Sequence, residues 1–310
     1  MPVVRAVVTG AAGFIGSHLV QALVAGGHDV LAVDAVERAG SREAALANRA
    51  ELAQAGIAVT EIDLATDDLS RLAGADVVLH LAGRPGVRSS FGPGAADAHR
   101  DNVIATERLL AACRGARFVL ASSSSVYGSA ERPCAEGDRI DPLSPYAASK
   151  ALAEQLAQAN GAAVILRYFS VYGPRQRPDM AFHRFIEAAL DGSPAPLYGD
   201  GRQSRSFTYV GDVVAATIRA AQVPLPAGTV LNIGNPHTVG VRDALDRIGT
   251  LLGTRPPTVA KDAAPGDVTR TWAGTDRAAA LLGWTARTSL DEGLAHQISW
   301  HRARRKVAHG

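Results

Sequence analysis

The residues best suited to chemistry lie in one short stretch, Tyr146-Ala147-Ala148-Ser149-Lys150. On a helix, Tyr146 and Lys150 are one turn apart and share a face. A free tyrosine is a poor base because its pKa is about 10, but a nearby ammonium favours the phenolate and lowers that pKa. Such a pair can take a proton from a sugar or alcohol hydroxyl. Ordinary solvated helices also show this spacing, so the interpretation depends on what the rest of the chain supplies.

A glycine-rich turn near the start of the chain predicts a cofactor site. The octet Thr9-Gly10-Ala11-Ala12-Gly13-Phe14-Ile15-Gly16 lies between a predicted strand, residues 3–9, and a predicted helix, residues 18–25. Glycines let the backbone approach a pyrophosphate, which binds at the N-terminus of the helix. In this strand, turn and helix order the octet strongly indicates a dinucleotide site.

Acidic residues at the ends of the next two predicted strands bear on the cofactor. The strand at 29–33 ends at Asp34, where a carboxylate can accept hydrogen bonds from the adenosine ribose and disfavours the 2′-phosphate of NADP. We therefore expect NAD, with a loop-capping Asp as the alternative. The strand at 57–62 ends at Asp63-Leu64, which is either an adenine contact or an ordinary turn.

Further strands at 75–80, 118–121 and 163–169 continue an α/β alternation with helices at 35–55, 102–113 and from Pro145 onward. We expect a doubly wound parallel sheet of the Rossmann type, with ligands at the carboxyl ends of its strands. Four serines, residues 122–125, follow the fifth strand; they are either hydroxyl donors to a substrate or plain loop.

The alternation lapses after residue 169, where a basic, proline-rich loop covers residues 172–180. We predict a helix at 181–190, a strand at 196–198, a return to the first domain with a helix at 212–221 and a strand at 230–233, and helices at 240–252 and 290–301. The expected domains are an NAD-binding Rossmann domain, residues 1–169 plus 207–236, and a smaller C-terminal α/β substrate domain, residues 170–206 plus 237–310.

The composition fits a soluble globular protein: 310 residues, 47% hydrophobic, 20% charged and a net charge of +2. The arginine-rich end suggests a frayed, solvated tail more than a nucleic-acid site. No apolar run approaches the roughly 20 residues of a membrane span, and no signal-peptide pattern is present. Two cysteines, Cys113 and Cys134, suit a reducing cytoplasm and have no ligand neighbours, so no metal site is expected.

Together, these motifs make the chain resemble extended short-chain dehydrogenases/reductases of the NAD-dependent nucleotide-sugar epimerase/dehydratase family, most of all the UDP-glucuronate 4-epimerases. The markers are the glycine octet, the serine run, the Tyr146/Lys150 pair, Arg205-Ser206-Phe207 and Pro265-Gly266-Asp267. The resemblance implies bound NAD and a C-terminal domain that closes over a UDP-sugar.

The resemblance also assigns residues. The catalytic set it implies is Ser123, Tyr146 and Lys150. The cofactor contacts it implies are Gly10, Gly13, Phe14, Ile15, Gly16, Asp34, Asp63, Leu64, Leu81, Ala82, Gly83, Asn102, Ala121, Tyr146, Lys150 and Tyr168. The substrate contacts it implies are Pro85, Val87, Arg88, Ser123, Ser124, Tyr146, Ser170, Arg177, Met180, Tyr198, Arg205 and Asp267. Among these, Arg205 is expected on the diphosphate and Tyr198 against the base.

Two features favour epimerisation over related reactions. Related 4,6-dehydratases carry an Asp-Glu pair after the catalytic Ser/Thr, but Ser124 and Ser125 stand here, so dehydration is not expected. An epimerase needs only Tyr146 to move the C4 hydroxyl proton while a hydride passes to NAD and back through a transient 4-keto sugar.

The loop at residues 173–180 resembles that of UDP-glucuronate 4-epimerases, where the arginine matching Arg177 holds the sugar carboxylate. A 4-keto sugar with a C5 carboxylate loses carbon dioxide readily, and fixing the carboxylate in the ring plane would suppress that loss. A small hydroxyl residue at Ser170 also fits. The alternative is that Arg175 and Arg177 bind only phosphate or solvent.

Two positions depart from the family pattern: Ser206 replaces the usual Asp after the arginine, and Ala264 replaces a phosphate-binding Arg, a role that Arg270 could take. We predict a cytoplasmic UDP-glucuronate 4-epimerase that binds neither nucleic acid nor membrane and forms a homodimer through helices 102–113 and 146–158. Alternatives are a UDP-glucose/UDP-galactose 4-epimerase, an NDP-4-ketosugar reductase and, outside enzymes, an NAD-sensing module.

Overall fold

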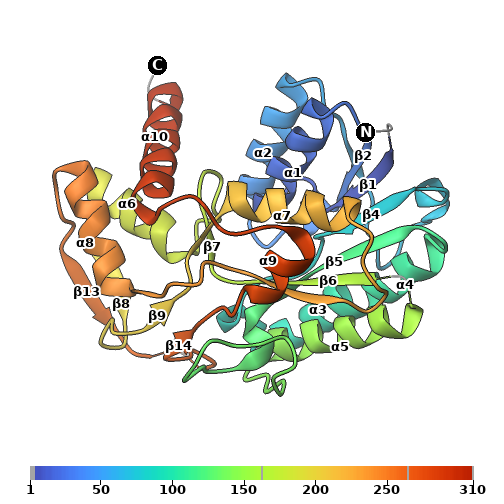
Figure 1. The fold of residues 1–310 in the computed structure, drawn as a ribbon. Coiled ribbons are helices and arrows are strands. Elements are labelled where there is room, and N and C mark those ends of the chain that lie inside the picture. Colours follow the sequence, from blue (N-terminus) through green and yellow to red (C-terminus); the bar gives the residue numbers. More distant parts are fainter. Residues whose placement is uncertain (1–3, 162, 264, 309–310) are drawn as a thin grey trace.

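A parallel seven-stranded sheet forms the centre of the molecule, which we describe from a computed structural model covering residues 4–161, 163–263 and 265–308 (Figure 1). The strand order is β11-β6-β5-β4-β1-β2-β3. The strands are β1 (Arg5–Thr9), β2 (Asp29–Asp34), β3 (Val59–Glu61), β4 (Val77–His80), β5 (Arg117–Ser123), β6 (Ala163–Tyr168) and β11 (Val230–Ile233). The chain adds β2 and β3 on one side of β1 and then returns to add β4, β5, β6 and β11 on the other side. This order confirms the predicted doubly wound Rossmann fold.

Helices cover both faces of this sheet (Figure 1). One layer contains α1 (Phe14–Ala25), α2 (Arg42–Gln54) and α7 (Val210–Gln222); the other contains α3 (Gly94–His99), α4 (Ala105–Ala112) and α5 (Pro145–Asn160). Because successive strand side chains point to opposite faces, Ala6 and Val8 belong to the core that includes Leu19, whereas Val7 belongs to the core that includes Leu109.

A second, separate core lies beside the sheet. It is built by α6 (Ala181–Asp191), β8 (Ala195–Tyr198), α8 (Val241–Leu252) and α10 (Leu290–Ala308), with Phe182, Phe185, Leu245, Ile248 and Leu294 buried in it. β13 (Thr258–Lys261) pairs with β8. Three short strands, β9 (Ser204–Arg205), β12 (Val239–Gly240) and β14 (Arg270–Thr271), form another sheet, and β7 (Val171–Tyr172) pairs with β10 (Thr208–Tyr209). α9 (Asp276–Leu282) packs back on β11 and α7.

Several element boundaries differ from the predictions. α1 begins at Phe14, directly after the glycine turn, rather than at residue 18. The helix predicted at 35–55 is divided into a 3₁₀ turn (Val36–Arg38) and α2. The helix predicted from residue 102 begins at Gly94 and passes through a π-helical segment, η4 (Arg100–Ile104). Ser122 and Ser123 are the last residues of β5, not loop residues.

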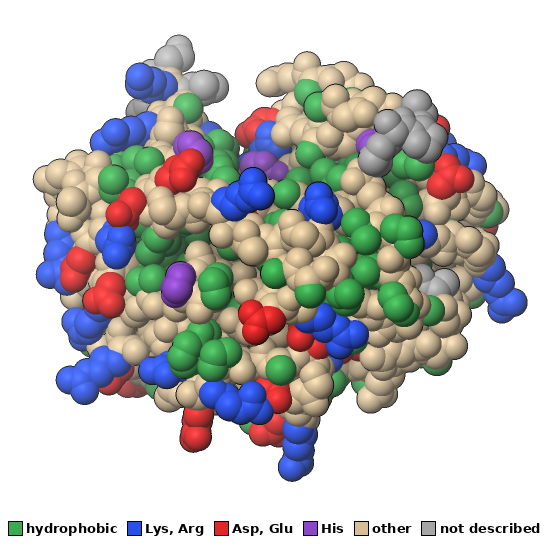
Figure 2. All heavy atoms as spheres, viewed as in Figure 1, with side chains coloured by type: hydrophobic (Ala, Val, Ile, Leu, Met, Phe, Trp, Pro, Cys, Tyr) green, Lys and Arg blue, Asp and Glu red, His purple; other side chains and the backbone are tan. Residues whose placement is uncertain are grey.

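The predicted tail is solvated, since Arg302, Arg304 and Lys306 are exposed, but it is not frayed: α10 runs to Ala308, and Arg305 in it pairs with Glu187 and Asp191. Val3 and Ala264, which the sequence analysis singled out, lie outside the described residues. Within the described ranges, no helix has both the length and the apolar character to cross a membrane. Figure 2 shows acidic and basic side chains interspersed over one face of the molecule.

Candidate active site

Two adjoining cavities lie at the carboxyl edge of the central sheet. The first, about 500 Å³, is lined by residues that follow β1, β2, β4, β5 and β6. The second, about 450 Å³, is bounded by α6 and β8. Both are lined by Gly86, Val87, Ser170, Val171, Arg177, Met180, Arg205 and Asp267. One elongated ligand or two ligands could therefore meet at this shared wall.

The glycine turn shapes one end of the first cavity. Gly10 has a φ of +73°, and a Cβ there would lie 2.6 Å from the Ala82 nitrogen. A Cβ on Gly16 would lie 2.0 Å from the Gly10 carbonyl oxygen. Gly13 is the N-cap residue of α1 and offers no side-chain cap, and the first N–H groups of a helix have no intrahelical partner. Phe14, Ile15 and Gly16 line the cavity there, and this donor set fits a dinucleotide pyrophosphate.

Asp34 lies at the end of β2 against the same turn. Its Oδ2 accepts a hydrogen bond from the Ala12 nitrogen at 2.8 Å, and its Oδ1 accepts one from the Ala35 nitrogen at 2.8 Å. Burial raises the pKa of Asp34, and these hydrogen bonds oppose the rise. A carboxylate has about four lone-pair sites, so Asp34 can still accept hydrogen bonds from a ribose.

The Tyr146 helix is fixed at its start. Ser144 caps α5 by accepting a hydrogen bond from the Ala147 nitrogen at 3.1 Å, and Pro145 occupies the first turn. The Tyr146 nitrogen donates to Ser90 Oγ at 3.0 Å. Tyr146 and Lys150 both line the first cavity, and the Ser123 side chain hydrogen-bonds to Tyr146. The structure thus brings the three predicted catalytic residues together.

Burial governs the proton affinities of this set. It raises the pKa of Tyr146, while the Ser123 hydrogen bond and the charge of Arg177 lower it. Burial lowers the pKa of Lys150 to about 8, and the charge of Glu154 opposes that change. The expected lowering of the tyrosine pKa is therefore absent here, because desolvation of the phenolate outweighs the nearby favourable interactions.

A buried polar network lies beneath the catalytic residues. Glu154, four residues after Lys150 on α5, accepts hydrogen bonds from Ser122 Oγ and, at 2.7 Å, from the Arg167 guanidinium. Arg167 also donates to the Tyr127 hydroxyl at 2.7 Å. Glu154 and Arg167 are 2% and 3% exposed. The network therefore ties the carboxyl end of β5, which carries Ser123, to the helix that carries Lys150.

Asn102 lines the first cavity, but its polar atoms bond to the protein. Its Nδ2 donates to Ser149 Oγ at 2.8 Å, and its Oδ1 accepts from the Arg84 nitrogen at 2.8 Å. A Cβ on Gly83 would lie 2.3 Å from that Oδ1. Asn102 thus holds the loop after β4 against α5.

Arginines on the second cavity all have protein partners. Arg177 donates to Asp179 through Nε and a terminal nitrogen, both at 3.0 Å. Arg88 pairs with Asp267 at 2.7 Å, and its guanidinium lies 3.6 Å from the centre of the Tyr198 ring. One face of Tyr198, the side chain predicted to pack on the base, is therefore covered by Arg88.

The departures from the family pattern have local explanations. Arg205 donates to the backbone carbonyls of Ser204, Val268 and Thr269, so it does not depend on an acid at position 206. Ser206 is buried and accepts a hydrogen bond from the Ala273 nitrogen at 3.0 Å. Arg270 bonds to Ser204 Oγ and lines neither cavity, so its proposed replacement of the missing arginine has no support.

Most predicted contacts line the two cavities. Arg88 and Tyr198 line only the second cavity. Asp63 and Leu64 line neither: Asp63 pairs with Arg100, and Leu64 is buried in the core. Their role at the adenine stays a prediction. The remaining predicted residues all line the first cavity, namely Gly10, Gly13, Phe14, Ile15, Gly16, Asp34, Leu81, Ala82, Gly83, Pro85, Val87, Asn102, Ala121, Ser123, Ser124, Tyr146, Lys150, Tyr168, Ser170, Arg177, Met180, Arg205 and Asp267.

Sequence reasoning missed part of the wall. Gly40, Ser41 and Asn48 line the first cavity beside the glycine turn, and Asn48 Nδ2 donates to the Ala12 carbonyl at 2.9 Å. One indication of this part of the wall was present in the sequence, namely the single asparagine, Asn48, in an alanine-rich predicted helix. Arg175, which also lines this cavity, pairs with Glu51 of α2 at 2.7 Å.

Comparison with known proteins gives consistent matches. Residues 6–234 match the NAD dependent epimerase/dehydratase family. The chain is 39% identical to the uncharacterized UDP-glucose epimerase YtcB of Bacillus subtilis, over 96% of this chain and 97% of that protein. The UDP-glucuronic acid 4-epimerase of Bacillus cereus, solved with UDP-glucuronic acid and NAD, superposes with a TM-score of 0.92 at 36% identity, covering 97% of this chain and 99% of that one.

A second solved protein is also similar. MoeE5, solved with UDP-glucuronic acid and NAD and again with UDP-glucose and NAD, is 43% identical, with TM-scores of 0.86 and 0.87. Each match covers 97% of this chain and 99% of that one.

Proposed function

The chain belongs to the NAD dependent epimerase/dehydratase family, and from that premise we propose that it is an NAD-dependent UDP-sugar 4-epimerase with UDP-glucuronate as its favoured substrate. One observation carries the proposal: Ser123, Tyr146 and Lys150 meet in a cavity that adjoins a second, arginine-lined cavity. The B. cereus 4-epimerase with a similar fold was solved with this sugar nucleotide and NAD.

The chain's own residues account for the proton movements. The Tyr146 phenolate would take the proton of the C4 hydroxyl and later return it. Ser123, which hydrogen-bonds to Tyr146, and Arg177, whose charge acts on it, both stabilise the phenolate. Bound NAD would supply the hydride acceptor. Ser124 and Ser125, which line the first cavity, stand where related 4,6-dehydratases carry the Asp-Glu pair for water elimination, so dehydration is not proposed.

The preference for UDP-glucuronate rests on Arg177, which lines both cavities and acts electrostatically on Tyr146. A guanidinium has five N–H donors, and Asp179 occupies two of them. The remaining N–H donors of Arg177 can donate hydrogen bonds to a sugar carboxylate. The same Asp179 contact favours a second candidate, UDP-glucose 4-epimerisation, because Arg177 already has a counterion without a substrate carboxylate.

Proton NMR of the purified protein with UDP-glucuronate and, separately, UDP-glucose tests the proposal. Conversion of UDP-glucuronate to UDP-galacturonate without added reduced cofactor is the expected result. Conversion of UDP-glucose alone would retain the epimerase and reject the carboxylate site. No conversion of either, even with NAD supplied, would favour the 4-ketosugar reductase.

We also propose a homodimer, a two-domain division and a cytoplasmic location. Ile104 of η4 and Leu152 of α5 are exposed apolar side chains on packed neighbouring elements, which supports an interface there. Separate cores support a division into two domains, proposed at residues 1–169 plus 207–236 and 170–206 plus 237–310, although Ala278 and Leu282 of α9, which falls in the second range, are buried in the first core. Two buried free cysteines suit a reducing compartment.

A further inference from the structure

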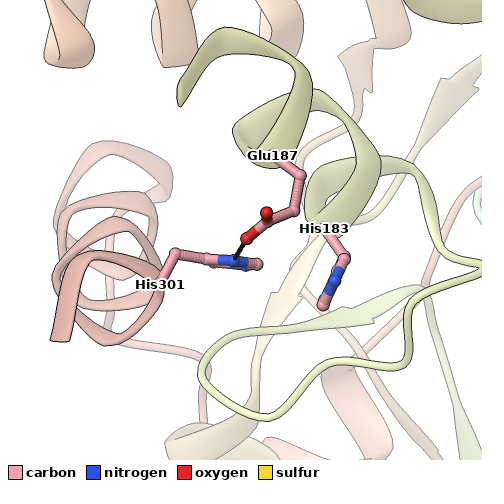
Figure 3. A group of neighbouring side chains, drawn as sticks. All are labelled: His183, Glu187 and His301. Carbon is pink, nitrogen blue, oxygen red and sulfur yellow. Dashed lines mark hydrogen bonds and ion pairs between the residues drawn. The ribbon is translucent and has the colours of Figure 1, made fainter. Parts of the chain in front are cut away.

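Two histidines and a glutamate meet where the last helix crosses α6 (Figure 3). His183 and Glu187 are one turn apart on α6, and His301 reaches them from α10. One ligand atom from each residue lies within 4.8 Å of the other two. Glu187 and His301 are 114 positions apart in the chain, so no sequence motif indicates this cluster.

We propose that His183, Glu187 and His301 bind one divalent transition-metal ion, with zinc favoured, that joins α10 to α6. Imidazole and carboxylate ligands suit zinc, and two histidines with one glutamate are an established three-ligand set that leaves a fourth position open. The proposed ligand atoms are His183 Nε2, Glu187 Oε1 and His301 Nδ1. This site lies outside the catalytic residues and does not rest on the proposed function.

Hydrogen bonds to neighbouring residues already orient His183 and Glu187 as metal ligands would be oriented. His183 Nδ1 lies 2.9 Å from the Gln176 carbonyl oxygen, which leaves Nε2 as the free ring nitrogen. Such outer contacts typically orient metal-binding histidines. The Glu187 Oε2 bonds to Arg305, while Oε1 bonds to His301 Nδ1. A metal at the Oε1–Nδ1 contact would replace the shared proton and add His183 as third ligand.

Burial and charge at the cluster are compatible with a cation. The His301 side chain is 2% exposed, whereas that of Glu187 is 34% exposed, so an ion can enter from the Glu187 side. Arg305 opposes a cation, but it also pairs with Asp191 at 2.7 Å. Arg304 lies over the Trp300 ring, 4.9 Å from its centre. Glu187 and Asp191 thus offset the positive charge of the two arginines.

The site would stiffen the wall of the second cavity. The opposite side of α6 lines that cavity through Phe182, Arg184 and Phe185. Gln176, whose carbonyl holds His183, also accepts hydrogen bonds from the His183 nitrogen and from Gln297 of α10 through its Oε1. It precedes Arg177 directly. A bound ion would therefore stabilise the base of the loop that carries Arg177.

Zinc titration of the full-length, untagged protein tests this site. After chelator treatment and desalting, zinc is added against a chromophoric competitor, and cobalt is added separately to record ligand-field absorption. We expect one ion per chain and a rise in melting temperature. His183→Ala should weaken binding by more than the roughly 10–100-fold that loss of an outer-shell contact costs. Glu187→Gln, at a part-exposed position, should weaken it as well.

His237→Ala is the matched control, because His237 is an exposed histidine away from the cluster, and it should leave binding unchanged. Circular dichroism checks that each variant is folded; if His183→Ala is not, Glu187→Gln decides. Absence of one-to-one binding in the wild type, or equal affinity in the wild type and the folded cluster variants, would overturn the proposal. Weak binding of several ions would identify only surface histidines and would overturn it too.

Discussion

Burial of the single residue Tyr146 makes its phenolate harder to form. Desolvation raises the pKa of its phenol, so the phenolate depends on the Ser123 hydrogen bond and on nearby positive charge. Tyr146→Phe removes the proton acceptor and keeps the ring. We expect turnover to fall by about 10²–10⁴-fold, the usual contribution of a general base, with little change in the affinity for the UDP-sugar.

Epimerisation is followed by NMR. The NAD content of each variant is measured as well, and calorimetry gives its affinity for the sugar nucleotide. Ser123→Ala is the companion variant; it keeps the base but removes a hydrogen bond that lowers its pKa. The acid limb of its kcat/KM profile should therefore move to higher pH. Wild-type turnover by Tyr146→Phe would remove this tyrosine from the mechanism.

We propose that Arg177, together with its partner Asp179, selects the sugar. Arg177→Ala should reduce kcat/KM for UDP-glucuronate far more than for UDP-glucose, because only the former offers a carboxylate. Arg205→Ala serves as the control: an arginine on the shared wall that is proposed to hold the diphosphate should affect both substrates alike. Equal losses for both sugars in Arg177→Ala would reject the carboxylate role.

Asp179→Asn separates charge from geometry at the same site. Asp179 is 63% exposed and Arg177 is 26% exposed, so their ion pair is worth at most about 1 kcal/mol. Asn retains one acceptor for Arg177 but removes the competing negative charge. We expect KM for UDP-glucuronate to fall several-fold and KM for UDP-glucose to stay constant in steady-state assays. A rise in KM for UDP-glucuronate would instead make Asp179 a positioning residue for Arg177.

At the scale of elements, the network between α5 and the end of β5 controls Lys150. Burial lowers the pKa of Lys150 to about 8, and the charge of Glu154 raises it. The ammonium is therefore present below about pH 8 and lost above it, so activity should decline as the pH rises through this value. His80 and Arg167 are the other titratable groups close by.

Glu154→Gln keeps hydrogen-bonding atoms for Ser122 and Arg167 but removes the negative charge. The alkaline limb of the kcat profile should move to lower pH, because Lys150 then loses its proton more easily. Ser122→Ala is the control; it removes one contact to Glu154 and keeps the charge, so it should lower the rate without moving that limb. Superimposable pH profiles for Glu154→Gln and wild type would contradict this coupling. Because Arg167 is buried, its unpaired charge should also lower the melting temperature of Glu154→Gln.

The elements that the sequence predicts well are those specified by local chemistry. The glycine octet carries the turn that leads into α1, and Ser144 and Pro145 supply the cap and the first residue of α5. The predictions from sequence failed where contacts between residues far apart in the chain determine the structure. The helix that begins at Gly94 passes through η4, and no residue type in the sequence predicts that π-helical segment. Likewise the Arg88–Asp267 pair joins positions 179 apart in the chain, so the covering of Tyr198 could only be seen in the structure.

For the whole molecule, the arrangement of α4, η4 and α5 on one face of the sheet leaves an apolar surface exposed. Ile104 is 37% exposed and Leu152 is 42% exposed, although both belong to elements that pack together. Pairing this face with a second copy would bury these side chains and form a two-fold interface. We expect sedimentation equilibrium to give twice the chain mass of 32.2 kDa.

Leu152→Glu tests that interface, because it places a charge on the exposed apolar face while retaining a good helix former. The expected result is a mass close to one chain with an unchanged circular dichroism spectrum. Leu251→Glu, at a 39% exposed leucine of α8, is matched in exposure but belongs to a helix that packs in the second core, so it should remain dimeric. A monomeric wild type would reject the dimer, and a dimeric Leu152→Glu would locate the interface elsewhere. Because Tyr146 and Lys150 lie on the same helix as Leu152, a monomeric variant with full turnover would show that the catalytic helix needs no partner to hold it.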